Sequence, residues 1–444
     1  MNNFDVIVLG TSLDGLATAA LCSKHGLKTA IIGYKNSIQN DFEDIADAIP
    51  YKWDAGIGVF SQILKILEIK NDIHFTEPEY IDEIHLENFT IARKFGWINY
   101  QLQLAELFPL EKDNIQTFFS EVYDIGQEWL LLLQTGSIFS VKKMMKYRDT
   151  LYSDFVQQHF SNPTLVNLLN ADIPRTNVTL PVMAGYISTQ VFDCHIIKHN
   201  YADLFSIFTQ YLEKSNVSIL RDEDIFEILR NETDNNFILK TKKSTIFSSS
   251  WLISTFDENN TYKTYFPEIN TNKVDIKSYD PICLITAKIK VDKTYNQTLP
   301  ILFYSSKSPI ETLHSLENGE RNNSLKIRIF SNNENIFIQG EFPPEYDEVE
   351  SRKSIIEIAK NKFNIPIQSN NQITWFSADD IERYFGYSKG FTYRWAFRKN
   401  ETSMNPFSHT TEIKNLLTTG HWGTAWFTAA ITASRYVKQN LKVF

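Results

Sequence analysis

At the start of the chain, the pattern of apolar and polar positions predicts a strand, then a helix, then a second strand. Residues 4–9 form a short, β-branched apolar run that ends at Gly10, which is typical of a buried parallel strand. Apolar residues recur at helical spacing over residues 13–25, and Gly26 follows as a helix C-cap. Residues 28–32 are apolar again. The pattern predicts a βαβ unit at the start of the chain.

Farther along, the pattern predicts a helix-rich middle and a strand-rich second half. Residues 101–170 have helical periodicity, and residues 201–215 form an amphipathic helix. Residues 282–291 alternate like a strand, and residues 324–330 and 336–340 have the pattern of a hairpin. The other predicted elements are strands at 217–220, 225–229, 237–241, 250–254 and 415–420, and helices at 351–363 and 426–441.

Length and composition narrow the class of protein. The chain has 444 residues, more than one hydrophobic core usually serves, so we expect two interleaved domains. Apolar residues make up 43% and charged residues 22%, which excludes wholesale disorder. The formal net charge of −9 argues against a general nucleic-acid binder, because such binding relies on neutralising phosphates. The three scattered cysteines (Cys22, Cys194 and Cys283) form neither a disulfide framework nor a zinc cluster, which favours a reducing compartment.

The chain shows few signals for membranes. Its N-terminus has no basic segment before the first apolar run, so we expect no signal peptide, and no window of 18 uninterrupted apolar residues predicts a membrane span. Residues 129–133 are apolar and residues 140–148 carry clustered cations. This pattern fits a helix lying on an anionic membrane surface, or a buried helix followed by a solvated turn. We expect a cytoplasmic protein, with peripheral membrane contact as an open alternative.

The strongest chemical signal is the turn Gly10-Thr11-Ser12-Leu13-Asp14-Gly15 between the first predicted strand and helix. A dinucleotide-binding turn has three glycines, which permit a tight turn, close approach of the pyrophosphate and helix–strand packing. The diphosphate then lies at the helix N-terminus, where free N–H groups and the dipole favour an anion. Here Gly10 and Gly15 are present, but Ser12 stands at the middle glycine position. Gly33 stands where an acid would bind the ribose after the second strand.

Six further segments, in order along the chain, point to one family. They are Tyr51-Lys52-Trp53-Asp54-Ala55-Gly56, Tyr152-Ser153-Asp154-Phe155 with Phe160-Ser161-Asn162-Pro163, Lys198-His199-Asn200-Tyr201, Asp222 to Ile228, Glu382-Arg383-Tyr384-Phe385-Gly386 with Lys389-Gly390-Phe391, and Lys414-Asn415-Leu416 to Gly420-His421-Trp422. Together they resemble the FAD-dependent phytoene desaturase and carotenoid isomerase group, within the amine-oxidase-like flavoproteins.

The resemblance implies an α/β fold in which an FAD/NAD(P)-binding Rossmann-like domain is interleaved with an α+β substrate domain. Residues 1–75, 196–257 and 406–444 would form the dinucleotide-binding domain, residues 76–195 a helical substrate or lid domain, and residues 258–405 a mixed-sheet substrate domain. The implied cofactor is FAD. The residues expected to bind it are Gly10, Ser12, Leu13, Asp14, Gly15, Gly33, Ile225, Gly420, His421, Trp422 and Trp426.

The departures from the family pattern fall where backbone should meet FAD. Besides Ser12 and Gly33, they include His199-Asn200 in place of a Gly-Gly pair, and Trp426 in a turn that is glycine-rich in the family. A tryptophan there either fills the space of the flavin ring or stacks on the ring from a changed angle. The chain has only 16 glycines, and the deficit lies at these cofactor positions.

Two main functions remain open, besides a third in which the chain is a lost-cofactor subunit that partners an active paralogue. The first is an FAD-dependent oxidoreductase that desaturates or isomerises a long apolar or polyene-like substrate by hydride transfer to the flavin. The second is a flavin-less, non-catalytic protein that binds a lipid, a prenyl group or a protein partner, as the Rab GDP-dissociation inhibitors do with this fold. We assign no catalytic residue.

Two histidine positions carry weaker chemical signals. His421 is a candidate acid or base or a structural turn residue. His195 and His199 would suit a metal only if they were helical, so we expect no metal site.

Overall fold

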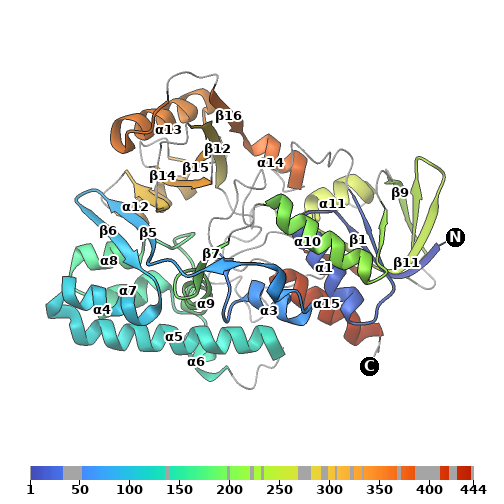
Figure 1. Ribbon diagram of the computed structural model, residues 1–444, viewed down its shortest axis with the longest axis horizontal. Helices are drawn as coiled ribbons and strands as arrows, with labels where there is room; N and C mark the ends of the chain where they lie inside the picture. The colour runs from blue at the N-terminus through green and yellow to red at the C-terminus, as the bar shows by residue number, and fades with distance from the viewer. Residues whose placement is uncertain are drawn as a thin grey trace.

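The computed structural model describes residues 2–33, 53–135, 141–197, 201–220, 225–231, 235–268, 282–291, 299–305, 308–320, 325–332, 335–343, 345–367, 372–385, 411–419 and 428–441. Figure 1 shows a first sheet near both chain termini, a helical unit at the far end and a second sheet above it.

The first sheet is built around β1 (Asn2–Leu9), whose Val6, Ile7 and Val8 are fully buried. Its strand order is β8-β2-β1-β11-β10-β9, and β17 pairs with β11. Strands β8, β2, β1, β11 and β17 run parallel, whereas β10 and β9 are antiparallel. The bounds are β2 Thr29–Ile32, β8 Ser218–Leu220, β9 Ile225–Arg230, β10 Phe237–Thr241, β11 Ile246–Ser254 and β17 Leu416–Thr418.

Helices cover both faces of this sheet, which explains the continuous apolar runs of its parallel strands. Val6 and Val8 pack with helices α1 (Leu13–Lys24), α3 (Val59–Ile66), α10 (Tyr201–Lys214) and α15 (Thr428–Leu441). Ile7 and Leu9 pack on the other face with α11 (Glu258–Tyr265). The predicted βαβ unit is confirmed, with α1 as the crossover helix between β1 and β2.

The second sheet has the strand order β16-β12-β15-β14-β13-β5-β6. The predicted hairpin is confirmed as β14 (Lys326–Asn332) and β15 (Asn335–Phe342), which pair antiparallel. The hairpin β5 (Tyr80–Leu86) and β6 (Phe89–Lys94), which the sequence analysis did not predict, joins the sheet through parallel pairing with β13. The remaining strands are β12 Cys283–Lys290, β13 Ile301–Tyr304 and β16 Ile373–Phe376, and the helices attached to the sheet are α12 Pro309–Glu317, α13 Glu348–Phe363 and α14 Ala378–Phe385.

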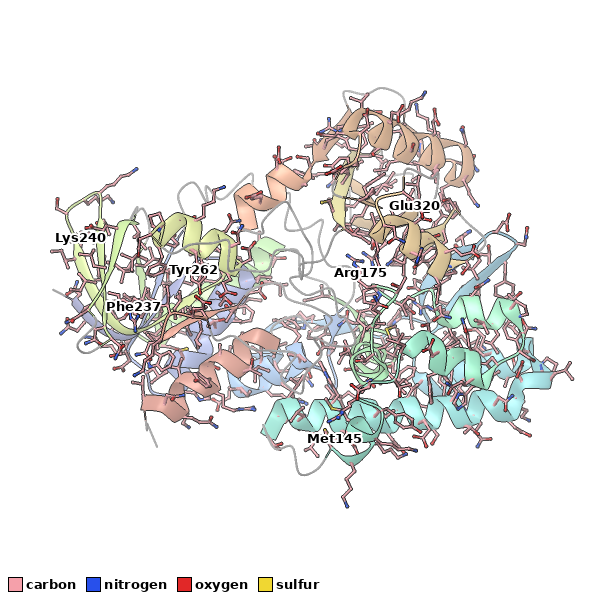
Figure 2. The ribbon with its side chains drawn as sticks, turned by 180° about the vertical axis from the view of Figure 1, so that it is seen from behind. Met145, Arg175, Phe237, Lys240, Tyr262 and Glu320 are labelled. Carbon is pink, nitrogen blue, oxygen red and sulfur yellow. The ribbon has the colours of Figure 1, made fainter. Side chains whose placement is uncertain are left out.

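The helical unit surrounds α5 (Lys112–Thr135), which packs mainly on α9 (Leu180–Gln190). Its other helices are α4 Trp97–Leu107, η2 Pro109–Glu111, α6 Lys142–Lys146, α7 Tyr152–His159 and α8 Pro163–Leu169. A small sheet of β3 (Trp53–Asp54), β7 (Cys194–Ile197) and β4 (Phe75–Thr76) connects this unit to the first sheet, near the one-turn helix η1 (Lys70–Asp72). Figure 2 shows the described side chains from behind, with Arg175 labelled between the second sheet and the helical unit.

The apolar stretch at residues 129–133, at the C-terminal end of α5, packs into the core that α1, α3, α10 and α15 form with the first sheet. Trp129, Leu130 and Leu133 are buried, and the following cation Lys143 forms ion pairs with Glu121 and Asp124. This arrangement matches a buried helix followed by a polar turn, and peripheral membrane contact stays a prediction. Within the described ranges, no helix is both long and apolar enough to cross a membrane.

Candidate functional site

The predicted dinucleotide turn lies at the carboxyl end of β1. Gly10 donates its backbone N–H to the carbonyl of Ile32 (2.8 Å), which fixes the turn against the end of β2. The φ angle of Gly10 is +106°, a value that side-chain-bearing residues rarely adopt. A Cβ atom there would lie 2.0 Å from Oγ1 of Thr255. Glycine is therefore required at this position by both backbone conformation and space.

Ser12 caps helix α1 at the position of the missing middle glycine. Its backbone has φ −62° and ψ 167°, an ordinary extended conformation that does not need glycine. Its Oγ accepts a long hydrogen bond of 3.4 Å from the backbone N–H of Gly15. A serine N-cap of this kind satisfies one of the free N–H groups of the first turn. The hydroxyl therefore lies among the donors that an anion would use.

Asp14 places a carboxyl group in the first turn of α1. The residue is only 5% exposed, and its Oδ1 has no hydrogen-bond partner. Burial raises the pKa of this carboxyl from 3.8 to about 7, because desolvation disfavours the charged form. A charged carboxylate here would repel a diphosphate at the same helix end, whereas the protonated form would not. Asp14 thus couples the electrostatics of this turn to pH.

Some of the other predicted cofactor residues lie within the residues that the structure describes, and others lie outside them. Gly33 directly follows β2 and offers no side chain to a ribose. Ile225 begins β9, which β10 and β11 separate from β1, so strand pairing does not bring it to the Gly10 turn. Gly420, His421, Trp422 and Trp426 lie outside the described residues, as do His199 and Asn200. Thr419, which precedes Gly420 in the sequence, donates its N–H to the carbonyl of Ser254 (2.6 Å). Ser254 pairs with Leu9, so this bond lies at the same sheet edge as the Gly10 turn.

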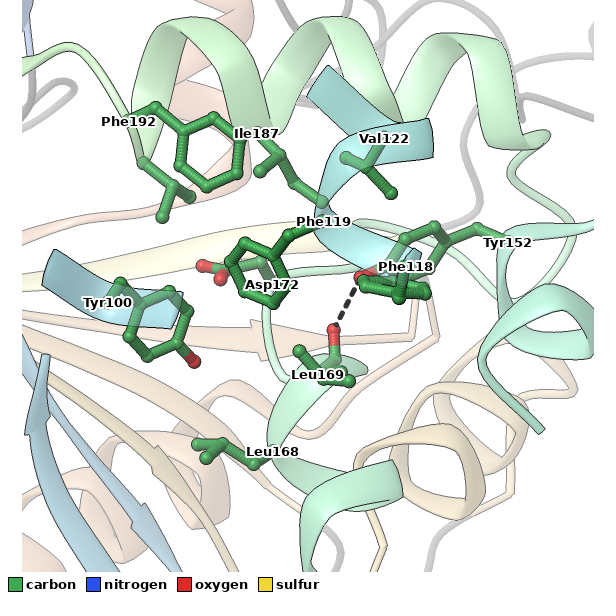
Figure 3. A pocket seen from close by; sticks show the side chains of 11 residues that line it. Tyr100, Phe118, Phe119, Val122, Tyr152, Leu168, Leu169, Asp172, Ile187 and Phe192 are labelled. Atoms are coloured by element: carbon green, nitrogen blue, oxygen red, sulfur yellow. Dashed lines mark hydrogen bonds between the residues drawn. The ribbon is translucent and has the colours of Figure 1, made fainter. Parts of the chain in front are cut away.

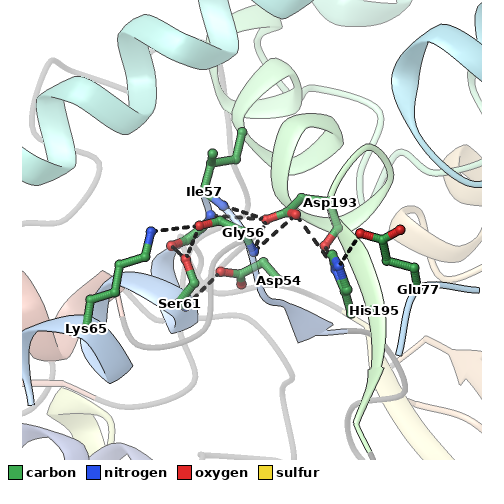
Figure 4. A network of polar contacts seen from close by, with 9 residues as sticks. Asp54, Gly56, Ile57, Ser61, Lys65, Glu77, Asp193 and His195 are labelled. Atoms are coloured by element: carbon green, nitrogen blue, oxygen red, sulfur yellow. Dashed lines mark hydrogen bonds and ion pairs between the residues drawn. The ribbon is translucent and has the colours of Figure 1, made fainter. Parts of the chain in front are cut away.

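The sequence analysis missed a pair of neighbouring carboxylates, the buried Asp54 and the partly buried Asp193, where β3 meets β7 (Figure 4). The Asp193 carboxylate accepts hydrogen bonds from the backbone N–H groups of Gly56 (2.9 Å), Ile57 (2.8 Å) and Gly58 (3.3 Å). Asp54 lies close by, with its Oδ2 3.3 Å from the N–H of Ser61. Burial, reinforced by the neighbouring Asp193, raises the pKa of Asp54 well above its ordinary value. The three N–H groups form an anion-binding nest that the protein fills with its own carboxylate.

His195 lies at the same junction, and its strand conformation does not match the helical His195–His199 metal pair considered in the sequence analysis. His195 lies in strand β7, so a helical i, i+4 pair with His199 does not form. Its Nδ1 is 2.8 Å from the carbonyl oxygen of Asp193, and Phe75 and Phe95 pack edge-on against its ring. Within the described ranges, no three His, Cys, Asp or Glu side chains converge as a metal site would require.

An aromatic cavity lies inside the helical unit (Figure 3). Its walls include Tyr100, Phe118, Phe119, Tyr152 and Phe192, and its volume is about 20 Å³. Such a space holds about one water molecule and cannot hold a polyene chain. Tyr152 spans it by donating its hydroxyl to the carbonyl of Leu169 (3.1 Å). This cavity is therefore part of the packing of the helical unit, and it is too small to be a chamber for a long apolar substrate.

Comparison with known proteins supports the fold. No family model matches the chain. The inactive all-trans-retinol 13,14-reductase of Danio rerio is 21% identical over 310 residues, which cover 61% of this chain and 50% of that protein. The chain thus spans about half the length of this curated relative.

Three solved structures are similar over nearly their whole length. Cyclohexylamine oxidase from Brevibacterium oxydans has a TM-score of 0.56 at 8% identity and 99% coverage of both chains. Putrescine oxidase bound to putrescine has a TM-score of 0.59 at 10% identity, covering 100% of this chain and 99% of that one. An oxidoreductase from Methanosarcina mazei has a TM-score of 0.57 at 11% identity, covering 98% and 99%. The chain therefore has the FAD-binding amine-oxidase-type fold, which confirms the predicted fold class, whereas the finer phytoene desaturase resemblance stays a prediction.

The described residues fit the diphosphate of the FAD that this fold implies. Gly10 and Gly15 let the turn pack closely against Thr255 and the Gly10 carbonyl, and Ser12 keeps an ordinary backbone conformation with its hydroxyl at the helix N-terminus. The ribose side fits less well, because Gly33 supplies no acceptor side chain. The α1 N-terminus therefore offers donors of the kind that hold a phosphate, and the ribose side lacks its acid.

Proposed function

We propose that this protein is an FAD-dependent oxidoreductase that acts on a long apolar, polyene-like substrate. The observation that carries the proposal is the Gly10–Gly15 turn, in which both remaining glycines occupy positions that no larger residue could take. A flavin bound there would accept a hydride from the substrate, and the protein would align the two and exclude water. The printed name of the curated relative refers to retinol, a polyene, which supports the substrate class.

The residues of this chain would act by positioning. The α1 N-terminus and the Ser12 hydroxyl would hold the diphosphate, and Thr419 lies at the same edge of the sheet. We extend the proposal to Gly420, His421, Trp422 and Trp426, which the family resemblance places beside the flavin. The carboxyl ends of parallel strands are where such folds bind cofactors, which supports this placement.

A second candidate is a flavin-less protein that binds an apolar ligand or a protein partner. It is favoured by the buried Asp14 carboxyl beside the diphosphate position and by the missing ribose acid at Gly33. The relative in Danio rerio is itself described as inactive. The two candidates differ in one measurable property, which is the tight binding of FAD.

Reduction of bound flavin tests the first candidate. Flavin-loaded protein would be mixed anaerobically with lipids extracted from the source cells, and the flavin absorbance would be followed. Bleaching by one lipid fraction, together with a substrate product two hydrogens poorer, is the expected result. No bleaching by any fraction, with flavin still bound, would contradict oxidoreductase activity on such substrates.

A further inference from the structure

Two carboxyl groups meet at the small sheet that connects the helical unit to the first sheet (Figure 4). Both lie against Gly58. Its N–H is 3.3 Å from Oδ2 of Asp193, and a Cβ atom on Gly58 would lie 2.1 Å from Oδ2 of Asp54. Asp54 is 2% exposed and Asp193 is partly buried. We call these two residues the carboxyl pair, and two negative charges so close together in a buried place repel each other strongly.

The surroundings of the carboxyl pair offer little positive charge. Strand β3, which carries Asp54, packs against β7, α3 and α9. The titratable side chains on these three elements are Cys194 and His195 on β7, Lys65 on α3 and Tyr186 on α9. His195 lies on the side of Asp193, with Nδ1 3.7 Å from its Oδ1, and its Nε2 is 3.8 Å from Oε1 of Glu77. Lys65 is exposed, and its ammonium group bonds a backbone carbonyl. The charge that acts most strongly on Asp54 is therefore that of Asp193.

The two carboxyl groups differ in how well the protein stabilises each as an anion. Asp193 accepts hydrogen bonds from the N–H groups of residues 56–58 and lies beside His195. Asp54 is more deeply buried, and the N–H of Ser61 is 3.3 Å from its Oδ2. Burial, followed by the charge of Asp193, raises the pKa of Asp54 well above its ordinary value of 3.8. Burial also raises the pKa of Asp193, against the lowering effect of its N–H donors and of His195. The proton of the pair therefore resides on Asp54 and the charge on Asp193.

The carboxyl pair holds a junction that has few other hydrogen bonds of its own. The pairing of β3 with β7 is only two residues long, with Asp54 opposite Cys194. The three N–H groups of residues 56–58 attach the segment after β3 to Asp193, directly before β7. A short junction of this kind can open locally while the larger cores on either side stay folded.

We propose that the carboxyl pair is a proton-controlled latch, which keeps the β3–β7 junction closed while Asp54 holds its proton and favours opening when that proton is lost. In the open junction, water reaches Asp54 and its pKa returns to the ordinary 3.8. Opening therefore releases one proton and becomes more favourable as the pH rises from this value toward the raised pKa of the closed form. Above the raised pKa, the free energy of opening no longer changes with pH. The latch goes beyond the proposed function, because it needs neither flavin nor substrate.

Amide hydrogen exchange of the full chain over a pH series tests the latch. Exchange through an opening equilibrium that ignores pH rises about 10-fold per pH unit, because hydroxide catalyses it, and opening that releases a proton adds up to about 10-fold more. From about pH 5 to about pH 8, we expect exchange at residues 56–61 of wild type to rise clearly more than 10-fold per unit. The β14–β15 hairpin is the internal reference and should show the smaller rise.

A variant that cannot ionise separates the latch from a general change in stability. Asp54→Asn keeps an oxygen for the N–H of Ser61, so its residues 56–61 should follow the same pH dependence as the hairpin. Asp149→Asn removes an exposed carboxylate and should keep the steep wild-type dependence. The thermal midpoint shows whether Asp54→Asn is folded, and the comparison within wild type decides the matter without it. Equal pH dependences of residues 56–61 and the hairpin in wild type, or a steep dependence in folded Asp54→Asn, would overturn the latch.

Discussion

Gly15 faces the carbonyl oxygen of Gly10 so closely that a Cβ atom on Gly15 would lie 2.1 Å from that oxygen. This contact joins the first turn of α1 to the end of β1 and sets the N-terminus of the helix at the edge of the sheet. The same atoms that define the proposed diphosphate site therefore also hold the fold together.

Replacing Gly15 by alanine should destabilise the protein by about 2–3 kcal/mol, because helix and strand must separate to admit the methyl group. Ser12→Gly is the matched control in the same turn, because it removes atoms instead of adding them. A glycine at a helix N-cap costs only a few tenths of a kcal/mol, and complete loss of the capping bond costs about 1 kcal/mol. Urea unfolding curves measure both changes. Equal stabilities of Gly15→Ala and wild type would show that the contact is looser than described.

Asp14 should make stability fall as the pH rises. Its pKa in the folded protein, about 7, exceeds the ordinary value of 3.8, so the folded protein keeps a proton that the unfolded chain has released between these values. The contribution to the free energy of unfolding is most favourable below about pH 4 and is lost progressively up to pH 7. A shift of this size corresponds to about 4 kcal/mol.

Asp14→Asn should therefore raise the thermal midpoint most at pH 7 and above, and progressively less as the pH falls toward 4. The exposed Asp149→Asn variant is the control and should leave the pH profile unchanged. Parallel pH profiles of Asp14→Asn and wild type would mean that this carboxyl is ionised at neutral pH in the folded protein.

Glu341→Gln should be strongly destabilising, because it leaves three cations without their shared carboxylate. Removing one partner of a buried ion pair costs about 3–5 kcal/mol. Glu348→Gln removes an exposed partner of Arg352 and should cost less than about 1 kcal/mol. Denaturant unfolding of both variants gives the comparison, and similar losses of stability would contradict the burial of the Glu341 ion pairs.

Asp193→Ala should loosen the junction between β7 and the segment before α3. The change leaves the N–H groups of Gly56, Ile57 and Gly58 without their acceptor, which should cost about 2–4 kcal/mol. Asp193→Asn keeps one carbonyl oxygen and should lose less. Amide hydrogen exchange at residues 56–58 reports the effect locally, and unchanged protection in the alanine variant would refute the role of Asp193.

Elements with local patterns could be predicted from the sequence. The β1–α1–β2 unit and the β14–β15 hairpin follow from short-range periodicity, and both have the predicted positions. The hairpin of β5 and β6 was missed although its own pairing is local; its place in the second sheet depends on parallel pairing with β13, which lies more than 200 residues later in the chain.

In the candidate site, too, only the residues that lie close together in the sequence could be predicted. Gly10 and Gly15 could be identified because a dinucleotide turn has fixed spacing. The Asp54–Asp193 pair and the buried ion pairs of Glu341 could not, because their members are distant in sequence and no motif links them; Arg175 and Glu341 are 166 positions apart. The burial that shifts the pKa of Asp14 is likewise a property of the folded protein and not of the motif.

The FAD content of the purified protein tests the central claim most directly. Protein expressed with riboflavin in the medium would be denatured, and the released flavin would be counted per chain by absorbance and chromatography. The account predicts close to one FAD per chain, and a higher thermal midpoint when FAD is added to stripped protein. Flavin-free protein whose thermal midpoint does not respond to added FAD would contradict it.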